Sequence, residues 1–134
     1  MAKLVDIEGV GPVNARKLQK AGVRSTESLL KKGGTRKGRE EIAEASGIDK
    51  KVILQWVNHV DLFRIKGIAS EYSDLLEAAG VDTVVELANR DAANLVPLLT
   101  EVSEKNNLTN RVPNLKMVKS WVSQAKKLPR AVSY

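Results

Sequence analysis

Apolar residues in this chain recur at intervals of three and four, which is the period of an amphipathic α-helix. The clearest stretch in the middle of the chain is Val52, Ile53, Trp56, Val57 and Val60. A second clear stretch near the end is Leu115, Val118, Trp121, Val122 and Ala125. The pattern predicts an all-α protein in which both tryptophans belong to the core.

Short polar residues before these stretches predict where helices begin. We expect helices over about 12–21, from Ser25 or Thr26 to the Lys31–Gly34 break, over about 35–46, from Asp49 to about 63, from the Ile65–Ser70 turn to Ala79, after Thr83, after Asp91 and from Pro113-Asn114 to Leu128. Gly47 before Ile48 is a typical helix terminator. Pro97 predicts a kink or a later start for the helix after Asp91, and the polar stretch 104–110 predicts a loop.

The sequence Ile7-Glu8-Gly9-Val10-Gly11-Pro12 predicts a tight turn that opens directly into a helix. Gly9 and Gly11 allow positive φ and present no Cβ to an approaching group. Pro12 suits the first helical position, where a missing N–H costs nothing. The free amides of such a helix start and the helix dipole favour an anion. A phosphate is therefore the expected ligand.

The chain repeats itself at an offset of 58 residues. Ile65–Ser70 matches the first turn, and Ala79–Val81 matches Ala21–Val23. Trp56 and Trp121 correspond at a looser offset of 65. Internal repetition indicates duplicated structural units that bury a shared core. We expect repeats over 1–60 and 61–134 that share one core and pack with pseudo-twofold symmetry into one compact domain.

The first turn resembles the helix-hairpin-helix family, whose hairpin reads apolar-x-Gly-apolar-Gly before a helix that ends in Gly-apolar. The matching positions are Ile7, Gly9, Val10, Gly11, Ala15, Leu18, Gly22 and Val23. The whole chain resembles a tandem helix-hairpin-helix-like domain family of largely uncharacterised bacterial proteins. In the helix-hairpin-helix family the hairpin amides hold a DNA phosphate without reading sequence. The resemblance thus implies a DNA-phosphate site made of Gly9, Val10, Gly11, Val13 and Asn14, with Lys17 and Lys20 as nearby cations.

The second hairpin follows a predicted helix, whereas only six residues precede the first. We therefore expect the final helix, which is the repeat partner of 49–63, to pack beside residues 7–20 in place of the missing helix. This arrangement would bring Lys119 to the first hairpin and join the two basic ends of the chain.

Charge is unevenly distributed along the chain. Residues 1–40 and residues 106–134 each carry a net charge of +6, whereas residues 61–105 carry −5. A positive field is expected of a nucleic-acid-binding face. Within the first basic end, the segment Lys31–Arg39 is interpreted either as a mobile loop that grips a second phosphate through Arg36 and Lys37 or as an ordinary solvated linker.

The second hairpin differs from the first in chemistry. Ala69 replaces the second glycine, and the acidic residues around it are Glu71, Asp74, Glu77 and Asp82. Carboxylates would repel a phosphate, so we expect this hairpin to be structural or to bind a protein partner.

The composition argues against several other functions. Absence of cysteine removes disulfides and thiolate metal sites and agrees with an intracellular protein. His59 is the only histidine, is expected at the surface or at a helix end, and has no companion for a metal site or a catalytic set. Few aromatic residues argue against base stacking on single strands. The polar start and the lack of a long apolar run argue against a signal peptide and a membrane span.

These observations predict a non-catalytic, cytoplasmic protein that binds DNA through its backbone with little sequence specificity. No metal or cofactor and no membrane contact are expected. The alternative is a protein-interaction adaptor or self-associating module that uses the acidic second repeat. Gly11→Asp with Lys17→Glu should abolish the first activity, and Glu71→Lys with Asp74→Lys only the second.

Overall fold

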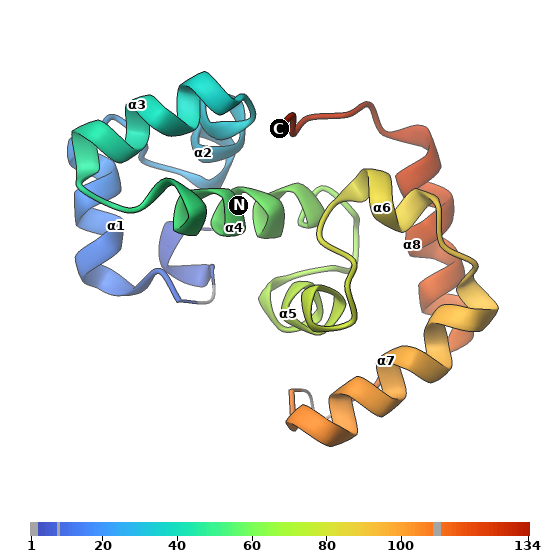
Figure 1. Cartoon of the computed structure of the whole chain (residues 1–134). Coiled ribbons are helices and arrows are strands. Elements are labelled where there is room, and N and C mark those ends of the chain that lie inside the picture. The colour runs from blue at the N-terminus through green and yellow to red at the C-terminus, as the bar shows by residue number, and fades with distance from the viewer. Residues whose placement is uncertain (1–2, 8, 109–110) are drawn as a thin grey trace. The chain divides into compact units, whose positions relative to one another are not determined.

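The computed structural model describes residues 3–7, 9–108 and 111–134, and Figure 1 traces their course. All regular structure in these residues is helical. It consists of a 3-10 turn, η1 (Leu4–Asp6), and the helices α1 (Gly11–Lys20), α2 (Thr26–Gly33), α3 (Arg36–Ser46), α4 (Lys50–Leu62), α5 (Ser70–Ala78), α6 (Val84–Ala88), α7 (Ala92–Asn106) and α8 (Leu115–Lys127). The all-α prediction is confirmed.

Side-chain caps explain why most of these helices begin where they do. Six residues accept a hydrogen bond from an amide in the first turn of the following helix, namely Ser25, Thr35, Asp49, Thr83, Asp91 and Asn114. Gly47 ends α3 with φ of 74°, as its terminator pattern predicts. α7 runs through Pro97 and continues to Asn106, so the loop predicted over 104–110 begins later than expected.

The chain divides into two compact units. The first comprises residues 1–61 and 131–134, and the second comprises residues 62–130. In the first unit α1 packs on η1 and α3, and α2 packs on α3. Ile7, Leu18 and Leu29 are fully buried there, and Trp56 is 3% exposed. The prediction that Trp56 belongs to the core is confirmed.

The α2–α3 junction is neither a mobile loop nor a solvated linker. Gly33 and Gly34 are buried, and a Cβ on Gly33 would lie 2.7 Å from a methyl carbon of Val57. A Cβ on Gly34 would lie 2.5 Å from the Ala131 carbonyl oxygen. The glycines therefore permit close packing, which the sequence pattern alone does not distinguish from flexibility.

The last residues of the chain are held against this junction. The Ser133 amide donates to the Gly34 carbonyl at 2.8 Å. The Arg39 guanidinium, 5% exposed, donates to the carbonyls of Gly33 at 2.9 Å and Ser133 at 2.7 Å. Burial lowers the pKa of Arg39, because desolvation disfavours its charged form. Residues 131–134 thus join the first unit and not the second.

The second unit has a hydrophobic core of its own. α8 packs on α6 and α7, and α5 packs on α7. Leu75, Leu76 and Leu87 are fully buried in this core, and Trp121 is 2% exposed. The Trp121 ring lies 5.2 Å from the ring of Tyr72. The prediction that Trp121 belongs to the core is confirmed.

The prediction that the final helix fills the missing place beside the first hairpin is wrong, because α4 holds that place. α8 packs on the hairpin of its own unit, where the Lys66 amide donates to Oε1 of Gln124 at 2.8 Å. In the first unit the place beside Gly9 belongs to Trp56 of α4, whose Nε1 lies 3.8 Å from the position of a Cβ on Gly9. Each hairpin therefore packs on the tryptophan of its own unit, and α4 already supplies the partner that the first hairpin needs.

Among the described residues, no helix has the length and apolar character that crossing a membrane requires.

Candidate phosphate-binding hairpin

Two glycines in left-handed conformations shape the first hairpin. Gly9 has φ of 87° and Gly11 has φ of 64°. A Cβ on Gly11 would meet no atom within 4 Å, so the space over this residue is open. Side chains at such φ values are strained, which explains the two glycines of the motif. The backbone of the turn is therefore accessible to a ligand.

The start of α1 lacks the side-chain cap that most other helices have. Its N-cap residue is Val10, whose side chain is buried and cannot accept a hydrogen bond. No described residue accepts a hydrogen bond from the amides of Gly9, Gly11 and Val13. Asn14 is the fourth residue after the N-cap, where a regular helix pairs the amide with the N-cap carbonyl, so its amide is not one of the free amides of the helix start. The Val10 amide donates to the Ile7 carbonyl at 3.2 Å and is already used.

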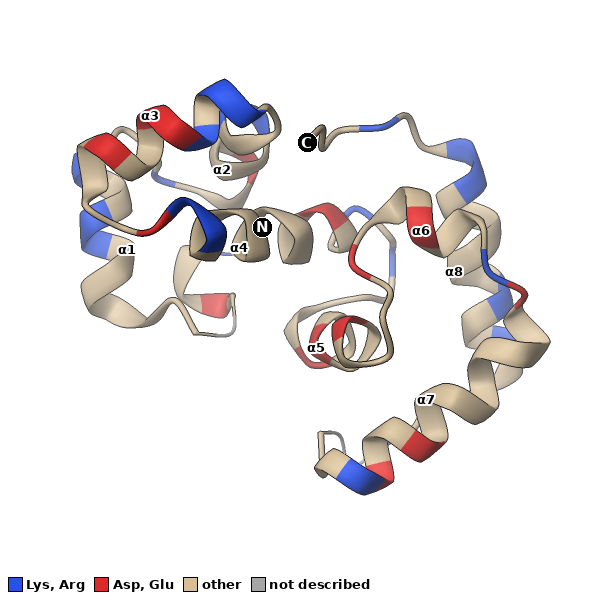
Figure 2. Cartoon of the chain, in the orientation of Figure 1, with Lys and Arg blue, Asp and Glu red and all other residues tan. Residues whose placement is uncertain are grey.

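The side chains along α1 add positive charge to this helix. The described charged residues of α1 are all cations, as Figure 2 shows, and Lys17 and Lys20 are both exposed. A shallow hollow of about 490 Å³ is lined by Arg16, Gln19, Lys20 and Arg24. Arg16 and Arg24 were absent from the predicted site, although their spacing of four from Lys20 on each side could have identified them. Val13 is 61% exposed on the same helix.

Arg36 and Lys37 do not join this group. They form the first turn of α3, which begins beside α2 and ends beside α1 (Figure 1). The Arg36 guanidinium lies 3.4 Å from the Glu40 carboxylate, with both side chains largely exposed. The two cations therefore lie at the end of α3 that is away from α1. α3 contacts α1, but not through the turn that carries Arg36 and Lys37.

Lys119 belongs to the second unit, on α8. There it lines a hollow together with Arg90 and Lys126. Its predicted place beside the first hairpin depended on α8 filling the place of a missing helix, and in the structure α4 fills that place.

The second hairpin has the same local hydrogen bonds as the first, but a side chain of its own unit binds its backbone at Lys66. The Val10 amide donates to the Ile7 carbonyl at 3.2 Å in the first turn, and the Ile68 amide donates to the Ile65 carbonyl at 3.1 Å in the second. Gly67 has φ of 101°, whereas Ala69, the counterpart of Gly11, is extended with φ of −120°.

The side chain of Gln124 forms two hydrogen bonds with the backbone of Lys66 in this second hairpin. Its Oε1 accepts from the Lys66 amide at 2.8 Å, and its Nε2 donates to the Lys66 carbonyl at 3.1 Å. A side chain of the same unit therefore occupies backbone groups of this turn.

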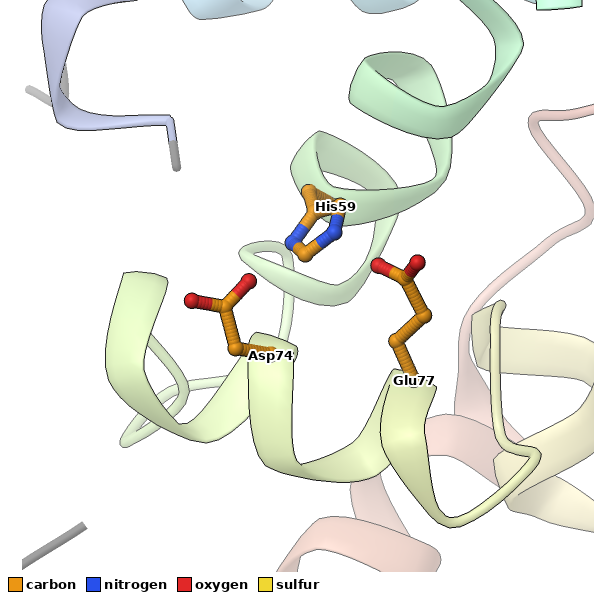
Figure 3. A group of neighbouring side chains, drawn as sticks. All are labelled: His59, Asp74 and Glu77. Carbon is orange, nitrogen blue, oxygen red and sulfur yellow. The ribbon is translucent and has the colours of Figure 1, made fainter. Parts of the chain in front are cut away.

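Two of the three acidic residues of α5 are only partly exposed. Figure 3 shows Asp74 and Glu77 one turn apart on the same side of the helix. Both are half-buried, and each has an interaction within the protein, as Glu71 also has. Two carboxylates on one helix do not by themselves complete a metal site.

His59 lies in the last turn of α4 (Figure 3), so its predicted helix-end position is correct. Its predicted surface position is wrong, because the side chain is only 4% exposed. His59 belongs to the first unit, whereas Asp74 and Glu77 belong to the second.

A family model described as "Domain of unknown function (DUF4332)" matches residues 8–128. No curated protein and no solved structure matches the chain. The matched region contains α1 to α8 and both glycine hairpins. The chain therefore belongs to the DUF4332 family.

Proposed function

We propose that this protein is a non-catalytic DNA-binding module whose first hairpin holds a backbone phosphate. The observation that carries the proposal is the start of α1, where uncapped amides follow an open glycine turn on a helix that bears only cations. Amides at a helix start and the helix dipole both favour a phosphate oxygen. The resemblance of the turn to helix-hairpin-helix motifs supports the same assignment.

The comparison between the two hairpins supports different roles for them. Matching hydrogen bonds at offset 58 agree with two helix-hairpin-helix-like units. In the second hairpin Gln124 occupies backbone groups at Lys66, and α5 carries acidic residues in place of cations. We assign a structural role to the second hairpin and the ligand to the first.

The binding follows from simple electrostatics. The amides of Gly11 and Val13 donate to phosphate oxygens, while Arg16, Lys17 and Lys20 attract the backbone. Such contacts position a protein without specifying bases, so we expect little sequence preference. Neutralising about 3–5 phosphates gives a slope of about −3 to −4 for log affinity against log salt.

The test is fluorescence anisotropy of a labelled DNA duplex titrated with the full chain at several salt concentrations. Gly11→Asp places a carboxylate at the phosphate, whereas Gly11→Asn has a similar shape, tolerates positive φ and carries no charge. We expect Gly11→Asp to weaken binding about tenfold or more, or by about 1.4 kcal/mol. Gly11→Asn should weaken it far less.

Ala69→Asp is the matched control, since it makes the same change of charge at the corresponding position of the second hairpin. Circular dichroism checks that each variant is folded. An equal loss for Gly11→Asp and Ala69→Asp would mean that only net charge matters and would overturn the proposal. Absence of duplex binding at low salt would overturn it too, and would favour the adaptor that uses Glu71 and Asp74.

A further inference from the structure

A hollow in the second unit lies between the α6–α7 connection and α8. Its volume is about 550 Å³. The residues that line it are Ala88, Asn89, Arg90, Asp91 and Ala92 on one side and Lys119, Val122, Ser123 and Lys126 on the other. This hollow is separate from the first hairpin, because all of its lining residues belong to the second unit.

Helix geometry directs two lysines into the hollow. Lys119, Ser123 and Lys126 are spaced by four and three residues on α8, so they lie on one face of the helix. α6 packs on α8, which brings the connection with Arg90 opposite this face. Lys116 and Lys127 belong to the same helix but do not line the hollow.

The three cations have no carboxylate partner among the described residues. The Arg90 side chain donates only to the Gly80 carbonyl, at 3.4 Å, which leaves most of its guanidinium donors available. Lys119 and Lys126 are exposed, and neither forms an ion pair with a described residue.

One carboxylate lies in the lining. Asp91 caps α7 by accepting from the Ala93 amide at 2.8 Å. Its negative charge is thus stabilised by the helix start. The lining retains an excess of two positive charges.

We propose that this hollow binds a phosphate group. Three unpaired cations that converge with the Ser123 hydroxyl match a multiply charged anion with several acceptor oxygens. The lining is otherwise formed by small or polar groups, apart from Val122, so a large apolar ligand is not favoured. The phosphate group comes either from a nucleic-acid backbone or from a small phosphorylated molecule, and the site does not depend on the first hairpin.

The test uses amide NMR spectra of the full chain titrated with inorganic phosphate at constant ionic strength, with chloride as the balancing salt. We expect saturable shifts at Ala92 and Ser123, and their loss in Lys119→Gln with Lys126→Gln. The matched control is Lys116→Gln with Lys127→Gln, which removes the same two charges from α8 and should leave the shifts unchanged. No saturable shift up to about 20 mM phosphate, or an equal loss in both pairs, would overturn the proposal.

A second titration with an unlabelled DNA duplex identifies the source of the phosphate. Shifts at Ala92 and Ser123 that the Lys119→Gln and Lys126→Gln pair removes would support the site and assign it to a nucleic-acid backbone. Phosphate shifts without duplex shifts at these amides would support the site and assign it to a small molecule. Running both titrations on Gly11→Asp separates this site from the hairpin. If the variant loses duplex binding but keeps the phosphate shifts at Ala92 and Ser123, the proposed function fails or changes at the hairpin while the phosphate site in the hollow still stands.

Discussion

The indole nitrogen of Trp121 lies 3.1 Å from the position that a Cβ on Gly67 would occupy. In the first unit the indole nitrogen of Trp56 lies 3.8 Å from the corresponding position on Gly9. Both glycines have positive φ, 101° at Gly67 and 87° at Gly9. The two hairpins thus share a packing contact with a tryptophan from the last long helix of their own unit, and the contact is tighter in the second.

This difference predicts unequal costs of adding a methyl group. Gly67→Ala should lower the free energy of unfolding by about 2–3 kcal/mol, because steric crowding by Trp121 adds to the strain of a positive φ. Gly9→Ala should cost about 1–2 kcal/mol, mostly from strain. Gly11→Ala has open space over it and serves as the control for strain alone. Urea denaturation of the three variants measures the order, and equal losses for Gly67→Ala and Gly11→Ala would contradict it.

The two hydrogen bonds between the Gln124 side chain and the Lys66 backbone give another prediction. Gln124→Ala removes two hydrogen bonds to Lys66 and should destabilise the protein by about 1–2 kcal/mol. Faster hydrogen exchange at the Lys66 amide should accompany the change, because this amide loses its acceptor. Ser123 is an exposed neighbour on the same helix, and Ser123→Ala should leave the free energy of unfolding almost unchanged. An unchanged rate of hydrogen exchange at the Lys66 amide would argue against these two hydrogen bonds.

Arg39 and the end of the chain form a contact that a lysine cannot reproduce. Arg39→Lys retains the charge but cannot reach the carbonyls of Gly33 and Ser133 together. We expect a loss of about 1–3 kcal/mol and faster hydrogen exchange at the Ser133 amide. Arg36→Lys is the control, since its ion pair with Glu40 is largely exposed and should be worth at most about 1 kcal/mol.

The lowered pKa of Arg39 predicts how this contribution depends on pH. Burial disfavours the charged guanidinium in the folded state, which lowers the free energy of unfolding. This cost is fully present below the folded pKa of Arg39 and is relieved only as pH rises through that value. A guanidinium loses its proton only in strongly alkaline solution. The difference in unfolding free energy between Arg39→Lys and the unchanged protein should therefore be the same between about pH 6 and pH 9. A marked slope in that range would mean that another group titrates with this contact.

The N-caps of α2 and α6 provide a local test in each unit. Ser25 accepts from the Ser28 amide at 3.1 Å, and Thr83 accepts from the Glu86 amide at 3.4 Å. Ser25→Ala and Thr83→Ala should each cost about 1 kcal/mol in thermal or urea unfolding. Ser25→Asn and Thr83→Asn should largely restore stability, because asparagine also caps helices. Failure of asparagine to restore it would indicate a role other than capping.

The local sequence determined the helices of this protein and most of their starts. Apolar residues at helical spacing predicted the elements, and Ser25, Asp49, Thr83 and Asp91 predicted four observed caps. These features succeed because helix periodicity and capping involve residues only a few positions apart.

Other features depended on residues far apart in the chain. Gly33 and Gly34 resemble a flexible break in sequence, yet Val57 and Ala131 make them packing positions. His59 is expected at the surface or at a helix end as a polar residue, yet its side chain is buried. Such outcomes follow from which helices pack together, and local spacing carries no information about that choice.

For the candidate sites, sequence determined the glycine turn and the run of cations on α1, because a single turn and a single helix contain them. Tertiary structure decided that Lys119 lies with Arg90 and Lys126 in the second unit, since packing of α6 on α8 brings these residues together. It also decided that α8 packs on the second hairpin, where Gln124 and Trp121 contact Lys66 and Gly67. The physical reason is that side-chain complementarity between distant segments, and not the period of either segment, selects the partner of each helix.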